Sequence, residues 1–221
     1  MKIRIVLSII ALGALCTPYL SAQDSKITTN LGMGLTVPVN PTGALIGSGV
    51  DVVVGAGYNF NKYHSLIGQF MWAGLPANRD AFRPIWLVAN RRDISGSSNL
   101  FALTANYRFR LQGKTFGAYL IAGGGMYYRR ASLSREVPVG TTTVCSPTWL
   151  WWGYTCVNGI VSEDQTLINA NSTAFGGNGG AGFTIRINEE GYKFYWEARY
   201  HYAPTKNIST QLITLTFGFA W

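Results

Sequence analysis

Hydrophobic and polar residues alternate with a period of two along much of this chain. The final segment shows the alternation most clearly, because the residues between its apolar positions are mainly Thr, Gly and Ala. Its apolar positions are Ile213, Leu215, Phe217, Phe219 and Trp221. Since successive side chains of a β-strand point to opposite faces, this alternation indicates a strand whose two faces meet different environments.

The same period predicts eight strands in the whole chain. They are expected at residues 27–38, 48–60, 65–75, 98–111, 116–130, 172–187, 193–203 and 209–221. Short turns and longer loops alternate between them, with the longest loop at 131–171 and a short last connection near Pro204. An even number of strands, with short turns at one end and longer loops at the other, is typical of a transmembrane β-barrel. The predicted fold is therefore all-β: an eight-stranded antiparallel up-and-down transmembrane β-barrel.

Composition identifies the environment of the apolar faces. Charged residues make up only 13% of the chain, while 14% are aromatic and 48% hydrophobic. This composition excludes intrinsic disorder and favours lipid as the solvent of the wide apolar faces. Aromatic side chains gather at the short-turn ends of those faces, where an interfacial girdle is expected. These are Tyr58, Phe60, Tyr107, Phe109, Phe194, Trp196, Phe219 and Trp221. A soluble β-protein, the alternative, would need wider polar faces.

The N-terminal segment predicts export. Two basic residues precede a short apolar run, 5–15, and a small-residue stretch that ends at Ala22. This pattern is typical of a signal peptide, and the run is shorter than the ~20 residues that a membrane span needs. We therefore expect a signal peptide at residues 1–22 and an outer-membrane β-barrel domain at residues 23–221.

Two cysteines remain once the signal peptide is removed. Cys145 and Cys156 lie in the longest loop, and an oxidising compartment favours a disulfide between them. Cys16 suggests a lipoprotein as an alternative, but Leu15 stands where a lipobox has a small residue. Two cysteines do not supply the four ligands of a structural zinc site, so no metal is expected.

An aromatic cluster lies between these cysteines: Trp149, Trp151, Trp152 and Tyr154. Rigid aromatic side chains in a closed loop are typical of binding hot spots. The cluster therefore predicts contact with an unidentified surface partner. The alternatives are a local hairpin cluster and aromatics that rest at the lipid boundary.

Several charged residues fall on the inward faces of the predicted strands. They are Asp51, Arg108, Arg110, Arg186, Glu197, Arg199 and His201. A buried unpaired charge costs several kcal/mol, so these groups must pair or reach water. Matched heights along the strands predict that Glu197 pairs with Arg108 or Arg186, and Asp51 with Arg199.

Three interpretations of this interior charge network remain open. The network could close a narrow eight-stranded barrel as a salt-bridge plug. It could line a small or gated pore with an anion preference, because arginines outnumber acids. It could also belong to a lipid-modifying enzyme that uses His201 at the outer rim and Ser209 nearby, although no third acid or oxyanion hole is evident. We predict no catalytic residue and no cofactor.

Several stretches carry a family resemblance. GAGYNF, YLIAGGGMYYRR, WEARYHY and LTFGFAW resemble the bacterial outer-membrane β-barrel domain family of small eight-stranded OmpA/OmpX-like barrels. The alternating segment that ends at Trp221 resembles the C-terminal signal that the barrel-assembly machinery reads. The resemblance implies a location in the bacterial cell outer membrane, with the assembly machinery as a partner during insertion. It also implies outer-membrane lipid and lipopolysaccharide as partners, and no nucleic acid despite the net charge of +8.

These observations together predict a non-enzymatic integral outer-membrane β-barrel. Its extracellular loops would contact the surface, lipopolysaccharide or a partner. Basic loop residues could bind lipopolysaccharide phosphates through charge-assisted hydrogen bonds. These residues are Arg79, Arg83, Arg91, Arg92, Arg129, Arg130 and Arg135. The small anion pore is the first alternative function, and the lipid-modifying enzyme is the second.

Overall fold

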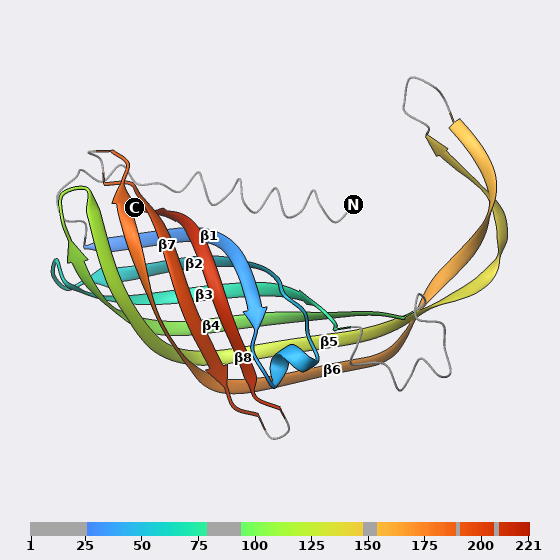
Figure 1. The fold of residues 1–221 in the computed structure, drawn as a ribbon, viewed down its shortest axis with the longest axis horizontal. Helices are drawn as coiled ribbons and strands as arrows, with labels where there is room; N and C mark the ends of the chain where they lie inside the picture. Colours follow the sequence, from blue (N-terminus) through green and yellow to red (C-terminus); the bar gives the residue numbers. More distant parts are fainter. Residues whose placement is uncertain (1–25, 79–93, 148–153, 189–190, 206–207) are drawn as a thin grey trace.

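Eight antiparallel strands form one closed barrel in chain order (Figure 1). The computed structural model describes residues 26–78, 94–147, 154–188, 191–205 and 208–221. The strands are β1 (Ile27–Pro38), β2 (Gly49–Asn59), β3 (His64–Pro76), β4 (Ile94–Gln112), β5 (Phe116–Pro147), β6 (Tyr154–Arg186), β7 (Lys193–Ala203) and β8 (Thr210–Ala220). β8 closes the barrel against β1, so no barrel edge is left open. The predicted fold class is confirmed, and the predicted signal peptide lies outside the described residues.

The two ends of the barrel differ. The connections β2–β3, β4–β5 and β6–β7 lie at one end, which also holds the C-terminus and is called the turn end (Figure 1). The opposite end, called the loop end, holds the short helix η1 (Thr42–Ala44) and the β7–β8 connection. Among the described residues, no helix is long and apolar enough to cross a membrane.

Side chains alternate between a filled interior and an apolar exterior. In β7 the residues from Tyr195 to Ala203 are alternately buried and exposed, and β8 continues this pattern. The outward side chains of β1 to β8 are mostly aliphatic or aromatic. The period-two prediction of the faces is therefore confirmed on these strands, because each strand separates lipid on one side from the packed interior on the other.

Aromatic rings pair on the outer face near the turn end. The rings of Phe116 and Phe183 stack at a centroid distance of 5.8 Å, and Phe194 meets Phe219 edge-on at 5.8 Å. Tyr58 packs edge-on against Phe60 at 5.6 Å. This belt matches the aromatic girdle that outer-membrane barrels have at the membrane–water interface.

The predicted loop at 131–171 is wrong, because β5 and β6 continue through most of it as a paired ribbon. β4 pairs with β5 only as far as the pair Ile94–Arg135, and beyond it the β5–β6 register continues to the pair Pro147–Tyr154. We call residues 136–147 and 154–164 the arm. Beyond the Ile94–Arg135 pair no other described strand joins the ribbon, and a strand sequence alternates only where its two faces meet different environments.

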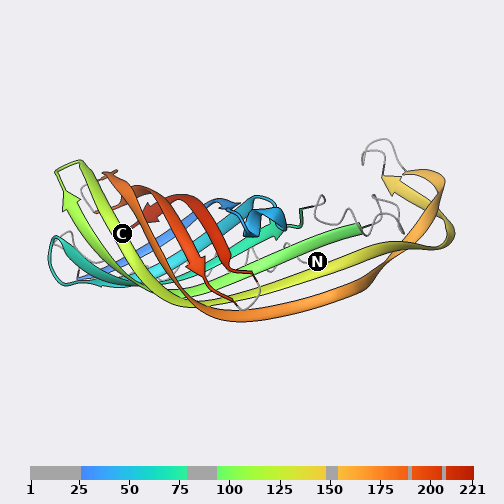
Figure 2. The same cartoon turned by 60° about the horizontal axis from the view of Figure 1, so that its bottom comes forward.

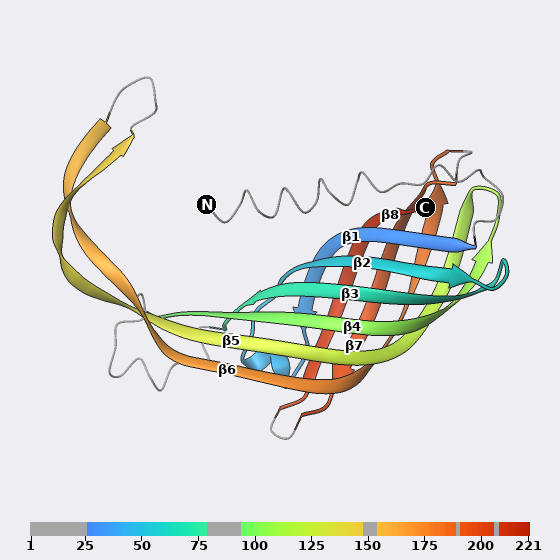
Figure 3. The ribbon, with the colours of Figure 1, turned by 180° about the vertical axis from the view of Figure 1, so that it is seen from behind.

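The arm extends well beyond the barrel and twists (Figures 1 and 3). The β5–β6 register shifts at two places. One shift lies at the base of the arm, between Leu133 and Ser134, and the other lies within the arm, between Pro138 and Gly140. Such bulges bend a ribbon and increase its right-handed twist. Figure 2 shows that β5 and β6 are curved strands which leave the barrel side by side.

Candidate functional site: the barrel interior and the arm

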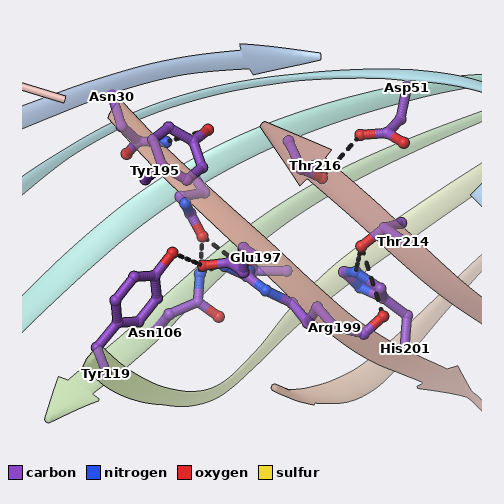
Figure 4. A network of polar contacts seen from close by, with 12 residues as sticks. Asn30, Asp51, Asn106, Tyr119, Tyr195, Glu197, Arg199, His201, Thr214 and Thr216 are labelled. Atoms are coloured by element: carbon purple, nitrogen blue, oxygen red, sulfur yellow. Dashed lines mark hydrogen bonds and ion pairs between the residues drawn. The ribbon is translucent and has the colours of Figure 1, made fainter. Parts of the chain in front are cut away.

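A buried ion pair lies at the centre of the barrel interior. Glu197 Oε1 lies 2.5 Å from Arg199 Nη2, and both side chains are about 5% exposed. Tyr119 Oη donates to Glu197 Oε2 over 2.9 Å (Figure 4). Residues two apart on one strand share the inward face, so a single strand supplies both members of this pair.

The pair is connected across the lumen to other strands. Arg199 Nη1 donates to Gln69 Oε1 over 2.8 Å, and Asn106 Nδ2 donates to the same oxygen over 2.9 Å. Asn106 also donates to Thr104 Oγ1 over 2.9 Å. Side chains from β3, β4, β5 and β7 therefore meet in one polar layer, which spans the lumen.

Asp51 is held separately by two hydroxyl groups. Thr36 Oγ1 donates to its Oδ1 over 3.0 Å, and Thr216 Oγ1 donates to its Oδ2 over 3.1 Å. The predicted pairing of Asp51 with Arg199 is therefore wrong. One threonine lies on β1, which pairs with β2, and the other lies on β8, the next strand around the barrel, so both satisfy the carboxylate from close by.

The remaining predicted cations lie in three different environments. The Arg108 guanidinium stacks over the Tyr119 ring at 4.7 Å. Arg110 is half-buried and donates to Asn59 Oδ1 over 2.9 Å. Arg186 is exposed at the end of β6, so its placement in the interior is wrong.

The predicted partners of Glu197 are wrong as well, because Arg199 occupies its Oε1. Arg186 ends its strand where the barrel opens at the turn end, and Arg108 lies over an aromatic face. A residue's place in the sequence gives only its height along a strand. It does not tell which side chains meet across the lumen.

His201 lies inside the barrel and not at its rim. Its exposed fraction is 3%, its Nδ1 lies 3.0 Å from Tyr127 Oη, and its Nε2 lies 3.3 Å from Thr214 Oγ1. Ser209 Oγ instead accepts from Gln211 Nε2 over 2.9 Å. The relay that an esterase-like site requires is therefore not assembled around this histidine.

Three inward tyrosines were not predicted as interior site residues: Tyr119, Tyr127 and Tyr195. Each is matched by nearby polar or small residues. A Cβ on Gly182 would lie 2.5 Å from Tyr119 Cζ, and a Cβ on Gly32 would lie 2.1 Å from Tyr195 Oη. Gly182 on β6 and Gly32 on β1 therefore make room for Tyr119 and Tyr195. The glycine run in β5 hid the alternation that would have placed Tyr119 and Tyr127 inside.

An apolar layer fills the interior nearer the loop end. Its members include the buried side chains of Met71, Leu75, Leu100 and Leu212. At the loop end, Thr42 Oγ1 on η1 donates to the Ser209 carbonyl over 2.8 Å. The cavity beside Arg199 and His201 measures only about 10 Å³, about the space of one water molecule. The described interior is therefore packed.

The arm carries the predicted disulfide positions. Its backbone register places Cys145 opposite Cys156. The disulfide between them stays a prediction. Of the predicted aromatic tip, Trp149, Trp151 and Trp152 lie outside the described residues, and the described backbone resumes at Tyr154, where β6 begins.

Two other predicted sets have clear positions. The proposed C-terminal assembly signal lies on the outer face, where Ile213, Leu215, Phe217, Phe219 and Trp221 are exposed along β8. Of the basic loop residues, Arg79, Arg83, Arg91 and Arg92 lie outside the described residues. Arg129 donates to the Ile208 carbonyl and to two threonine hydroxyls, each over 3.1 Å. It therefore holds the β7–β8 connection.

The described part of the chain contains no group of three or more His, Cys, Asp or Glu that could hold a metal ion. Interior donors such as Tyr119, Asn106 and Arg199 instead form hydrogen bonds within the chain. The chemistry that this interior supports is structural: it pairs charges and fills the lumen.

Comparison with known proteins agrees with this geometry. A sequence profile described as "Outer membrane protein beta-barrel domain" matches residues 7–220. No curated protein gives a significant match.

Several solved structures of small barrels match this chain. Neisserial surface protein A is 13% identical with a TM-score of 0.51, and the match covers 89% of this chain and 96% of that chain. Ail, the attachment invasion locus protein of Yersinia pestis, is 13% identical with a TM-score of 0.47, over 89% and 100%. Ail has also been solved with the heparin analogue sucrose octasulfate. The N-terminal β-barrel domain of Pseudomonas aeruginosa OprF is 14% identical with a TM-score of 0.42, over 90% and 100%.

Proposed function

Because this chain belongs to the outer membrane protein beta-barrel domain family and lies in the bacterial outer membrane, we propose that it is a scaffold. The proposed scaffold is non-enzymatic. Its barrel anchors the arm outside the cell, with the loop end outward and the turn end in the periplasm. The observation that carries this proposal is the arm itself. Twelve residues of β5, 136–147, continue past the last β4 pair, a reach of about 40 Å at the usual strand rise.

The backbone of the arm is suited to contact with another protein. A two-stranded ribbon presents two strand edges, and the edge of a sheet can accept a strand from a partner. Val139 on β5 and Ile168 at the base of the arm on β6 are both more than half exposed. An exposed, weakly charged ribbon with a high content of Thr, Val and Ile offers both hydrogen-bonding groups and apolar surface to a partner strand.

The charge of the arm selects among partners. Residues 136–164 contain three acids, Glu136, Glu163 and Asp164, and no Lys or Arg. A polyanion such as lipopolysaccharide or a sulfated glycan would be repelled by this segment. The proposed partner of the arm is therefore a protein with a neutral or basic surface.

The predicted disulfide supports this role. An isolated two-stranded ribbon is marginally stable in water. A bond between Cys145 and Cys156 would close a short loop at the tip and contribute about 2–3 kcal/mol. A rigid tip loses less entropy when it binds, which increases its affinity for a partner.

The packed interior supports a scaffold over a pore or an enzyme. The polar layer around Glu197 and the apolar layer around Leu100 both fill the lumen. His201 makes contacts only with Tyr127 and Thr214 among the side chains of the described hydrogen-bond network. The described residues leave no open passage for ions and form no catalytic relay at His201.

Removal of the arm tests the proposal. In the test variant an Asn-Gly turn replaces residues 136–164, because this dipeptide suits a two-residue hairpin connection. Cells with equal amounts of inserted parent or variant protein are compared for adhesion to extracellular-matrix protein coats and for cell–cell aggregation. Cells with the parent protein should adhere or aggregate more than cells without the protein. Cells with the variant should show no such increase. Equal contact by both would contradict the proposal.

A further inference from the structure

A cleft at the turn end is lined by two cations from different turns. Lys114 and Thr115 come from the β4–β5 turn, while Arg186, Ile187 and Asn188 come from the end of β6 and the residues after it. The cleft has a volume of about 280 Å³. It lies apart from the interior network and the arm, and neither of them explains it.

Backbone hydrogen bonds hold the two walls of the cleft. The Arg186 N–H donates to the Thr115 carbonyl over 2.9 Å, and this bond joins the two turns. Asn188 Oδ1 accepts from the Tyr192 N–H over 3.1 Å, which shapes the β6–β7 turn. Lys114 and Arg186 therefore line the same cleft from segments whose backbones are hydrogen-bonded to each other.

The cleft lies at the depth of the lipid boundary. Phe116 follows Thr115 directly, is 57% exposed on the outer face and stacks on Phe183. Ile187 is also 57% exposed. Aromatic girdles of this kind sit at headgroup level, so the cleft places its cations beside lipid phosphates and its apolar neighbours beside the acyl chains.

Further cations surround this end of the barrel. Lys26 precedes β1, Lys62 lies 4.9 Å over the Tyr63 ring, and Lys193 Nζ donates to Gln112 Oε1 over 3.0 Å. No acid is among the described residues that line the cleft. Glu189 and Glu190 follow in the sequence but lie outside the described residues.

We propose that the cleft binds the phosphate of an anionic phospholipid headgroup in the periplasmic leaflet. The Arg186 guanidinium can donate two parallel hydrogen bonds to phosphate oxygens, Lys114 adds a point charge, and the Thr115 hydroxyl adds a donor. The exposed Phe116 and Ile187 favour a lipid over a soluble phosphate, because they meet the acyl chains. This site does not depend on the arm or on the proposed scaffold function.

Lipid selectivity of the refolded mature protein tests the proposal. The protein is placed in phosphatidylcholine vesicles that contain traces of spin-labelled phosphatidylglycerol or spin-labelled phosphatidylcholine. The fraction of motionally restricted label gives the relative association of each lipid. The test variant is K114Q/R186Q, and K26Q/K62Q is the matched control, because it removes two cations from the same end of the barrel outside the cleft.

The wild type and the control should prefer phosphatidylglycerol, while K114Q/R186Q should lose most of that preference. A cation near a membrane surface contributes about fivefold to the association of an anionic lipid. All three proteins should show the same heat-dependent gel migration, which verifies that each barrel is folded. A wild type without preference would overturn the proposal, as would equal losses in both variants. Displacement of the labelled phosphatidylglycerol by inorganic phosphate would also overturn the assignment to lipid.

Discussion

Glu197 is the acid that joins two other members of the polar layer. Its carboxylate accepts from Tyr119 and pairs with Arg199, which in turn donates to Gln69. Because Arg199 is about 5% exposed, loss of its partner leaves a charge where water is scarce. The position of one carboxylate therefore affects side chains on several strands.

Substitution of this carboxylate should destabilise the barrel strongly. We expect Glu197→Ala to lower the free energy of unfolding by about 3–5 kcal/mol, because it leaves a buried cation without its partner. Urea unfolding of the refolded protein, followed by gel migration, measures the change. Glu163→Ala on the exposed arm is the control and should change stability by less than about 0.5 kcal/mol.

A double variant separates burial of charge from loss of packing. Glu197→Leu with Arg199→Met removes both charges and keeps apolar volume, so it should be more stable than Glu197→Ala. If Glu197→Ala unfolds at the same urea concentration as the wild type, water or another group satisfies Arg199 and the assigned role of the pair is wrong.

Gly182 gives a second test at the residue scale. A Cβ there would lie 2.5 Å from both Tyr119 Cζ and the Trp196 carbonyl oxygen, so Gly182→Ala should cost about 1–3 kcal/mol through overpacking. Gly140→Ala is the matched control, because a Cβ at Gly140 meets nothing within 4 Å. Urea midpoints of both variants measure the difference. Equal midpoints would show that the barrel accommodates a methyl group beside Tyr119 and the Trp196 carbonyl at no cost.

At the scale of the elements, β8 closes the barrel. Phe219 lies opposite Leu31 of β1 and contacts Phe194 of β7, while Thr29 and Trp221 exchange backbone hydrogen bonds of 2.8 and 3.0 Å. The last three residues therefore contribute both to barrel closure and to the proposed assembly signal.

Deletion of Phe219 to Trp221 should abolish insertion into the outer membrane. The deletion removes backbone pairs on both sides of β8 and leaves edges with unpaired groups that lipid cannot satisfy. Membrane fractionation measures the inserted protein. The double variant F219A/W221A keeps the backbone and separates closure from side-chain recognition. Wild-type amounts of inserted protein after the deletion would refute the assigned role of this segment.

The arm is the element with the least support from the barrel. A Cys145→Ser, Cys156→Ser double variant should still form the barrel, because these positions pair only with each other beyond the last contact with β4. Without the predicted disulfide, the arm should be cut faster by protease added to whole cells. Detection of thiols at both positions in exported wild-type protein would show that the disulfide does not form.

At the scale of the whole molecule, two layers close the lumen. A polar layer joins β3, β4, β5 and β7, and an apolar layer nearer the loop end includes Met71, Leu100 and Leu212. An eight-stranded barrel is just wide enough for its side chains to fill. The apolar layer was not predicted, and it is the part of the interior that most opposes the passage of ions.

The protein should therefore not conduct ions in planar bilayers. We expect no stepwise current at any applied voltage when the folded barrel is inserted, with a porin of known conductance as the positive control. Gel migration before and after the measurement verifies that the barrel stays folded. Reproducible unit steps would contradict the closed lumen and restore the small anion pore as a function.

The sequence by itself determined the barrel class, the strand order and the faces of most strands. Thr214 and Leu215 illustrate the reason: one is buried and the other exposed. A strand between lipid and a packed interior must alternate its side chains, and this alternation is local enough to be read directly from the sequence. The location in the outer membrane followed from the same pattern and from the family resemblance.

Only the tertiary structure decided which inward groups meet and where the arm begins. Glu197 pairs with Arg199, and Asp51 with two threonines, because the tilt and closure of the barrel determine the neighbours across the lumen. The arm could not be recognised from alternation, since no other described strand continues beside its ribbon. Apolar and polar residues alternate along a strand when its two faces meet different environments. Where the two environments are the same, alternation does not identify the strand.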